Sequence, residues 1–335
     1  MQRDIKMDSI KGLLILIVIL GHCLEVTSNS GITRIMYNGI YSFHMSLFVF
    51  ISGYFTNLNK DNKSHFNSIF NLLLIYAIFQ LIKSIPGLAT HSLSLKSAII
   101  FPQWTMWYIL SLVFWRLLFY VLCNWCSFKI NLVFLILFFI VSITCGFLPV
   151  GSELSLQRTL FYSFSFALGL YFREKKLIHL VYNANKYIVL ILLSISISAI
   201  IIFNDRDINW LLYGSSNYSD WPIMYEYCSI VRIAQIILSI LICIVFIKCC
   251  PINQLLSTLG TKTLFIYIYH SFVINALKHI NFSCNDFIIL LISLLVTFAS
   301  LYILDKIPFF YHLINPIRIL KNIQKACQNE ADNGK

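Results

Sequence analysis

Charged residues are scarce in this sequence. Of its 335 residues, 12% are Asp, Glu, Lys or Arg, about half the share found in an ordinary soluble protein. Acidic residues are the scarcer sign, at 14 against 25 basic ones, and there are 12 glycines. A soluble globule with so few charges could not cover its surface with polar groups. The composition therefore argues against a soluble enzyme and against a nucleic-acid-binding protein.

Apolar residues are abundant and gathered into long runs. They make up 59% of the chain, and the mean hydropathy is +0.78. Ten apolar stretches can be marked, at 10–26, 41–57, 69–86, 104–123, 130–150, 159–172, 187–203, 229–247, 263–277 and 285–304. Most reach the roughly 17 to 25 residues that a spanning helix needs, and they lack the alternating pattern of a membrane barrel. The sequence predicts an all-α membrane protein, a polytopic bundle of about ten transmembrane helices within residues 1–305.

The basic residues favour one orientation of this bundle. If the N-terminus is cytoplasmic, 17 of the 25 basic residues fall on the cytoplasmic side and 7 on the other, with Arg116 inside a helix. This asymmetry predicts that both termini are cytoplasmic. The first stretch contains Lys11, His22 and Glu25 and is followed by no small-residue cleavage site. We therefore expect a retained helix rather than a signal peptide.

The segment after the bundle, 306–335, is predicted to be a cytoplasmic interfacial helix and tail. Within it, 308–323 mixes apolar residues with Arg318 and Lys321, as interfacial helices do. A solvated tail is the alternative.

The ten cysteines predict neither a disulfide framework nor a metal site. Most lie in or beside the apolar stretches, where cysteine behaves as a small hydrophobic residue. Cys123 and Cys126 form a lone CxxC without nearby ligand histidines, so we expect no zinc and no other metal. Cys228 and Cys284 both fall on the predicted exterior side, and their pairing stays open.

Ionisable residues inside the membrane indicate function, because each costs about 2.5 to 3.5 kcal/mol to insert. Lys11 and His22 share the first predicted helix. Eleven residues at about 100° each return to within roughly 20° of the same face, about 16 Å along the axis. Glu25 lies on that face, where it can accept a proton from one imidazole nitrogen and raise the basicity of the other. This pattern favours His22 as a general base, and a helix-packing histidine is the alternative.

Further polar residues are candidates for the same site. His44, at the start of the next helix, should lie at the depth of His22 and bind a substrate hydroxyl or share a proton. Arg116, in mid-helix, needs a carboxylate, a phosphate or water. Arg158, Arg232 and His270 are candidate substrate contacts, although snorkelling arginines and a core polar histidine are the more ordinary explanations.

One predicted exterior loop, 204–228, combines aromatic and acidic residues. Trp210 and Trp221 are its candidate substrate contacts, since sugars present both apolar ring faces and hydroxyls. Aromatic residues also form belts at membrane interfaces, which is the alternative interpretation.

Five segments together resemble one known family. They read DSIKGLLILIVILGHC (8–23), FHMSLFVFISGYF (43–55), WYILSLVFWRLL (107–118), RTLFYSFSFALGLYF (158–172) and GTKTLFIYIYHSFVI (260–274). Spread along nearly the whole chain, they resemble the integral-membrane acyltransferases of acyltransferase family three, most closely the fucose O-acetylase-like branch. Lys11 and His22 match that family's basic residue, ten-residue gap and histidine.

The resemblance implies a multi-pass enzyme of the bacterial cell membrane, in contact with membrane lipids, that transfers acetyl from cytoplasmic acetyl-CoA to a hydroxyl of a cell-surface carbohydrate. It implies catalysis by His22, as general base or through an acyl-histidine intermediate. Arg116 or His44 is a candidate to stabilise the oxyanion. Some branches carry paired arginines in the third helix, where this chain has only Lys83, so Lys11 together with the cytoplasmic lysines is the expected contact for the CoA phosphates.

A polytopic transporter or flippase for a glycan or lipid-linked saccharide is the alternative function. Transporters often show internal repeats and paired interrupted helices. The sequence shows neither, which favours the acyltransferase.

Overall fold

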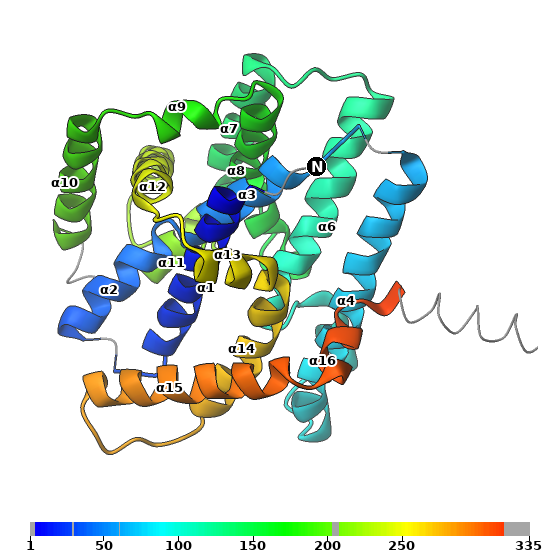
Figure 1. Ribbon diagram of the computed structural model, residues 1–335, viewed down its shortest axis with the longest axis vertical. Coiled ribbons are helices and arrows are strands. Elements are labelled where there is room, and N and C mark those ends of the chain that lie inside the picture. The colour runs from blue at the N-terminus through cyan, green and yellow to red at the C-terminus, as the bar shows by residue number, and fades with distance from the viewer. Residues whose placement is uncertain (1–3, 29, 60, 203–207, 318–335) are drawn as a thin grey trace, which may run out of the picture.

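The computed structural model describes residues 4–28, 30–59, 61–202 and 208–317, and within these ranges the chain forms helices and no strands (Figure 1). The α-helices are α1 (Ile5–Leu24), α2 (Gly31–Tyr41), α3 (His44–Phe55), α4 (Asn62–Ala89), α5 (Leu95–Ile100), α6 (Met106–Tyr120), α7 (Leu132–Thr144), α8 (Leu156–Glu174), α9 (Ile178–Tyr182), α10 (Lys186–Ile202), α11 (Asn209–Leu212), α12 (Cys228–Cys249), α13 (Gln254–Thr261), α14 (Thr263–Leu277), α15 (Asp286–Asp305) and α16 (Pro308–Leu313). A π-helical turn, Val121–Trp125, continues α6, and 3₁₀ turns lie at Cys145–Phe147, Glu153–Ser155, Tyr218–Asp220 and Tyr225–Tyr227.

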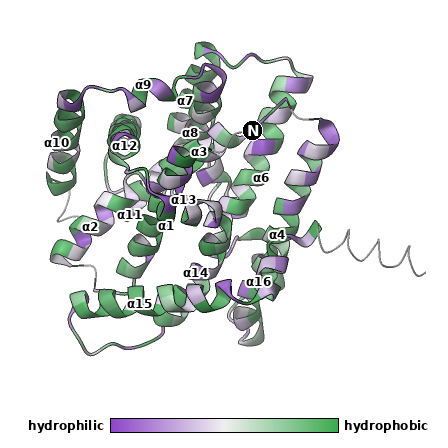
Figure 2. Ribbon diagram, viewed as in Figure 1, coloured by the Kyte–Doolittle hydropathy of each residue, from purple (hydrophilic) through white to green (hydrophobic). Residues whose placement is uncertain are grey.

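Each of the ten predicted apolar stretches coincides with a helix. Six spans are long and apolar enough to cross a bilayer: α1, α2 with α3, α4, α6 with its π-turn, α12 with the turn before it, and α15. The helices α7, α10 and α14 are shorter but apolar, and α8 covers the remaining stretch with 19 residues. Figure 2 shows apolar ribbon over most of α7, α10, α12 and α15. The predicted polytopic helical membrane bundle is confirmed.

The second predicted span is interrupted. The sequence suggests one continuous stretch over 41–57, but α2 ends at Tyr41 and α3 begins at His44. Between them Phe43 has φ −139° and ψ −27°, outside the helical region, and the Ser42 hydroxyl donates to the Gly39 carbonyl (2.7 Å). The interruption leaves the rings of Tyr41 and His44 with their centroids 4.7 Å apart.

Helix α1 occupies the middle of the bundle and packs against α2, α3, α13, α14 and α15 (Figure 1). Its two ends serve as reference points below. The Lys11 end carries the start of α1, the ends of α3, α8 and α12, and α9. The His22 end carries the end of α1, helix α2, residues 208–228 and the end of α14.

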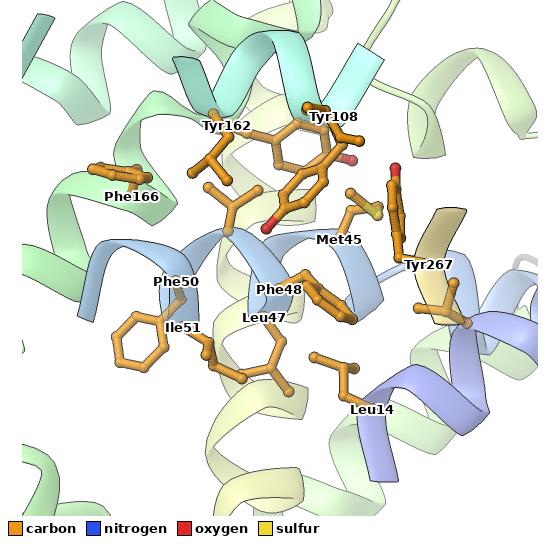
Figure 3. Close-up of a cluster of buried hydrophobic side chains, with 14 of the residues drawn as sticks. Leu14, Met45, Leu47, Phe48, Phe50, Ile51, Tyr108, Tyr162, Phe166 and Tyr267 are labelled. Atoms are coloured by element: carbon orange, nitrogen blue, oxygen red, sulfur yellow. The ribbon is translucent and has the colours of Figure 1, made fainter. Parts of the chain in front are cut away.

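Helices α3 and α8 approach closely through two glycines from the segments 43–55 and 158–172. A Cβ on Gly53 would lie 2.2 Å from the Phe166 carbonyl oxygen, and one on Gly169 would lie 2.1 Å from the Phe50 carbonyl oxygen. Small residues allow such contact between membrane helices. Figure 3 shows α3 at the centre of the resulting core, with Tyr108 and Tyr162 on one side and Leu14 on the other.

Parts of two sequence predictions lie outside the described residues. In the predicted interfacial segment 308–323, the structure describes α16, while residues 318–335, with Arg318 and Lys321, are outside it. In the loop 204–228, residues 204–207 are outside it. Cys228 and Cys284 are both free thiols, and the Cys228 Sγ lies 3.8 Å from the Tyr218 carbonyl oxygen.

Candidate active site

The last turn of α1 forms a histidine–carboxylate pair. The Nδ1 atom of His22 lies 2.7 Å from Oε1 of Glu25, the residue that caps the helix. The Tyr41 hydroxyl donates to the same carboxylate oxygen and lies 2.9 Å from His22 Nδ1. Because a carboxylate only accepts hydrogen bonds, this network assigns the imidazole proton to Nδ1. His22 Nε2 is then the basic nitrogen, as the i, i+3 spacing in the sequence predicts.

Glu25 is held as a carboxylate by two basic neighbours. Its second oxygen, Oε2, accepts from the Lys278 ammonium at the end of α14. Burial raises the pKa of Glu25, but the contacts with His22 and Lys278 outweigh burial and bring the pKa to about 2. The negative charge that orients His22 is therefore present at neutral pH.

Two further histidines lie against His22. The ring centroid of His22 is 5.4 Å from that of His270 and 6.5 Å from that of His44. His44 Nδ1 lies 2.9 Å from the Ile40 carbonyl oxygen, and His270 Nδ1 lies 2.9 Å from the Ile266 carbonyl oxygen. Each Nδ1 must carry a proton to make its bond, so in the neutral rings Nε2 is an acceptor.

His22, Glu25, Tyr41 and His44 border a cavity of about 200 Å³. It is lined by His22, Glu25, Tyr41, His44, Met45, Trp104, Thr105, Trp107, Arg158, Tyr162, Leu212, Tyr213 and Tyr267. The Trp104 ring centroid is 4.9 Å from that of His22. Trp104 has φ 39°, a left-handed conformation that costs energy for a bulky residue. Such strain is typical of residues positioned for function.

Three basic side chains lie around the cavity. The Arg158 guanidinium lies 5.0 Å from the Trp107 ring centroid. The ammonium groups of Lys278 and Lys83 lie 4.2 Å and 5.4 Å from the Trp104 ring centroid. Lys83 donates to the hydroxyls of Ser271 (2.7 Å) and Thr105 (3.2 Å). Basic side chains therefore outnumber acidic ones around the cavity, and Glu25 is the acidic residue in its lining.

A second cavity adjoins the first at the His22 end. It is more open, has a volume of about 370 Å³, and is lined by Glu25, Val26, Tyr37, Asn209, Tyr213 and Lys278. Glu25 and Tyr213 line both cavities. The Tyr37 and Tyr213 hydroxyls are hydrogen-bonded, and the Tyr37 ring stacks on Tyr41 at 4.1 Å. We call this second cavity the outer vestibule.

The sequence candidates divide into two groups. His22, Glu25, His44, His270 and Arg158 come together at the cavity, whereas Arg116, Arg232, Trp210, Trp221 and Lys11 lie elsewhere. The Arg116 guanidinium donates to Ser68 (2.8 Å). Arg116 follows Thr105 by eleven residues, about 16 Å along the helix. Arg116 therefore lies away from His22 and the cavity, where its contact is with Ser68.

Arg232 is fully buried in an aromatic environment beside the cavity wall. Its guanidinium lies 4.3 Å from the Phe161 ring centroid and 4.5 Å from that of Trp221. Trp210 packs on Trp221, with ring centroids 4.6 Å apart. Arg232 Nη1 donates to the Leu211 carbonyl (3.2 Å), immediately before the cavity residues Leu212 and Tyr213.

Lys11 lies at the opposite end of α1 from His22. Its ammonium pairs with Asp8 (2.6 Å) and lies 4.6 Å from the Phe55 ring centroid. Between Lys11 and His22 on this face, Ile15 and Val18 are at most 1% exposed. Packed side chains thus fill the path that the sequence suggests for the donor.

Several cavity residues escape the sequence analysis. No sequence feature sets Tyr41, Trp104 and Lys278 apart, because aromatic residues and helix-end lysines are ordinary at membrane interfaces. Tyr213 belongs to the aromatic loop 204–228, which the sequence offers as a sugar-binding segment. Lys83 is different: it lies inside the apolar stretch 69–86, so the cost of inserting an ionisable side chain points to it as well.

The fold and site define a polytopic membrane protein with a histidine–carboxylate pair at a cavity between its helices. The acyltransferase-domain profile of acyltransferase family three matches residues 4–306, and the chain belongs to that family, as the sequence segments predict.

Two relatives share shorter segments with the chain. Nodulation protein NolL of Mesorhizobium japonicum is 34% identical over 105 residues, which cover 30% of this chain and 27% of NolL. Nodulation protein NolL of Sinorhizobium fredii is 46% identical over 57 residues, covering 16% of this chain and 15% of the relative. The matches thus span about a quarter or less of these relatives. No solved structure matches the chain.

Proposed function

We propose that this protein is a membrane O-acyltransferase that moves acetyl from acetyl-CoA to a hydroxyl of a cell-surface carbohydrate or its precursor. The observation that carries the proposal is the His22–Glu25 pair, which lines a cavity that adjoins an outer vestibule. Membership of the acyltransferase family supports the reaction class. Acetyl as the acyl group and carbohydrate as the acceptor belong to the proposal.

In the proposed reaction, His22 Nε2 removes the proton of the acceptor hydroxyl as its oxygen attacks the thioester carbonyl carbon. General-base catalysis of this kind contributes typically about 10² to 10⁴-fold. A carbon–oxygen bond forms, the carbon–sulfur bond breaks, and the proton passes from His22 to the departing thiolate. Glu25 holds Nδ1–H and stabilises the imidazolium between these steps. Bound substrates that fill the cavity exclude water from it, which limits hydrolysis of the thioester.

Arg158 is the best placed group to stabilise the oxyanion. It lines the cavity, and a guanidinium stays charged at all working pH values. His44 with Nδ1 bonded to a carbonyl presents an acceptor at Nε2, which suits a second acceptor hydroxyl better than an oxyanion. This assignment replaces Arg116 and His44 as oxyanion groups and keeps His44 as a substrate contact, whereas His270 packs against His22 and is not part of the cavity lining.

The outer vestibule is the proposed entry for the acceptor. Tyrosine rings, an amide and a charged pair line it, a mixture that suits sugar ring faces and hydroxyls. With both termini in the cytoplasm, the vestibule opens to the exterior of a bacterial cell membrane. Reporter fusions within 208–228 should then report the exterior, and fusions after Lys176 the cytoplasm. A cytoplasmic signal from 208–228 would reverse this orientation.

The decisive experiment is transfer from labelled acetyl-CoA to a panel of glycans by the purified protein in detergent or nanodiscs. We expect a labelled ester on at least one glycan, removed by mild base and absent with His22→Gln. Glycan translocation into vesicles without ester formation would instead identify a transporter and reject the proposal.

A further inference from the structure

A third cavity lies between helices α3, α8 and α12. It has a volume of about 180 Å³ and forms a groove. On α12 its lining recurs every three or four residues, at Ile236, Ile240, Cys243 and Ile247. The lining runs from Gln235 to Ile247, twelve residues or about 18 Å of helix. The groove therefore follows the long direction of the helices for much of the bundle's depth.

Hydroxyl groups interrupt the apolar lining of this groove. Ser46 of α3, Ser165 of α8 and Ser239 of α12 each line it. Hydroxyls in a groove that bound only hydrocarbon would be unfavourable, because each polar group buried against hydrocarbon loses hydrogen bonds to water. Hydroxyls spaced along an apolar groove suit a slender, extended ligand that carries amide groups.

The groove's Lys11 end has a cationic rim. Val181 lines that end, and the next residue, Tyr182, accepts a hydrogen bond from Lys248 at its carbonyl (2.6 Å) and has the Lys6 ammonium 3.7 Å from its ring centroid. The Asp4 carboxylate at this end caps α1 through the Met7 amide (3.0 Å). The rim thus offers two basic side chains, Lys6 and Lys248, to an anionic head group.

The other end of the groove meets the catalytic cavity. On α3, Met45 lines the catalytic cavity and Ser46 lines the groove. On α8, Tyr162 lines the catalytic cavity and Phe161 lines the groove. Neighbouring side chains on two helices separate the two spaces. A reactive end group at the top of the groove would need to pass only this wall to reach His22.

We propose that the groove binds the acyl-CoA donor, with the phosphates at the Lys6 and Lys248 rim and the pantetheine arm against the three serines. The thioester then enters the catalytic cavity between Met45 and Phe161. This inference rests on the proposed function, since it assumes an acyl-CoA donor. It replaces the path along the Lys11 face of α1, which packed side chains fill.

The groove is tested by filling it. Ile240→Trp places a large ring in the groove, whereas Ile237→Trp, on the same helix at a position 49% exposed, points away from the groove lining. We expect Ile240→Trp to raise the KM for acetyl-CoA and the Kd for CoA by about tenfold or more, and Ile237→Trp to change neither. Equal donor affinity in two folded variants would overturn the proposal.

The rim is tested with a donor that lacks the phosphates. Lys248→Met and Lys6→Met should raise the KM for acetyl-CoA and leave the KM for acetyl-pantetheine unchanged, while Ile240→Trp should raise both. Similar losses with the two donors in the lysine variants would remove the phosphates from this rim.

Failure of this inference is distinguishable from failure of the proposed function. CoA binding and acetyl transfer by the wild-type protein, both insensitive to Ile240→Trp, would leave the acyltransferase intact and place the donor elsewhere. Lack of CoA binding by the folded wild-type protein would instead reject the acetyl-CoA donor itself.

Discussion

His22→Gln is the substitution that most directly tests the active site. Glutamine retains an amide that can donate to Glu25, so the contact now made by His22 Nδ1 at 2.7 Å can persist. It has no basic nitrogen to accept the proton of the acceptor. The expected loss is that of a general base, about 10² to 10⁴-fold, or roughly 2.7 to 5.4 kcal/mol in the barrier.

The assay measures initial rates of acetyl transfer at saturating donor and acceptor, together with the yield of monodisperse protein on size exclusion. His22→Gln should be recovered like the wild type and be almost inactive. His22→Ala should be equally inactive, with a lower yield, because it also leaves the buried Glu25 and Tyr41 without a partner.

Tyr41→Phe is the matched control for this prediction. It removes one hydrogen bond to Glu25 and keeps the histidine and its carboxylate, so transfer should fall by less than about tenfold, the cost of one ordinary hydrogen bond. The reasoning would be refuted by a folded His22→Gln protein with turnover near the wild type. His22 would then be a packing residue at the end of α1.

Three further substitutions probe the surroundings of His22. The pKa of Glu25 in the folded protein, about 2, lies below its ordinary 4.5, so its contribution to stability is complete above pH 4.5 and is lost as the pH falls towards 2. The melting temperature of Glu25→Gln should therefore depend less on pH between 4.5 and 2 than that of the wild type. An unchanged pH dependence would remove Glu25 from the charged network. Arg158→Met should lower kcat by about 10²-fold or more, the cost of losing an oxyanion group, whereas Arg116→Met should leave the transfer rate within a few-fold of the wild type. A larger loss of rate in Arg116→Met than in Arg158→Met would restore Arg116 to the reaction. Arg232→Gln, which weakens the hold on the Leu211 carbonyl, should raise the acceptor KM more than it lowers kcat, and an effect confined to kcat would argue for a direct catalytic role.

Local patterns account for what the sequence predicts correctly. The membrane class and the helices follow from composition and run length, because backbone groups in hydrocarbon must be satisfied within a helix. The pairing of His22 with Glu25 is also local, since residues three apart on a helix are neighbours. The interruption at Ser42 and Phe43 is not readable in this way, because the apolar run continues across it.

Tertiary packing decided which distant polar groups meet. His44, His270 and Arg158 reach His22, whereas Arg116 and Arg232 do not, although all five are ionisable residues in or beside apolar stretches. Whether each of these side chains lies near His22 depends on the rotation and depth of its helix. Rotation and depth follow from close contacts such as those of Gly53 and Gly169 between α3 and α8. The sequence by itself determined a helical membrane protein with a histidine–carboxylate pair on its first helix. Only the tertiary structure decided the cavity around that pair, because a cavity is a property of several helices packed together.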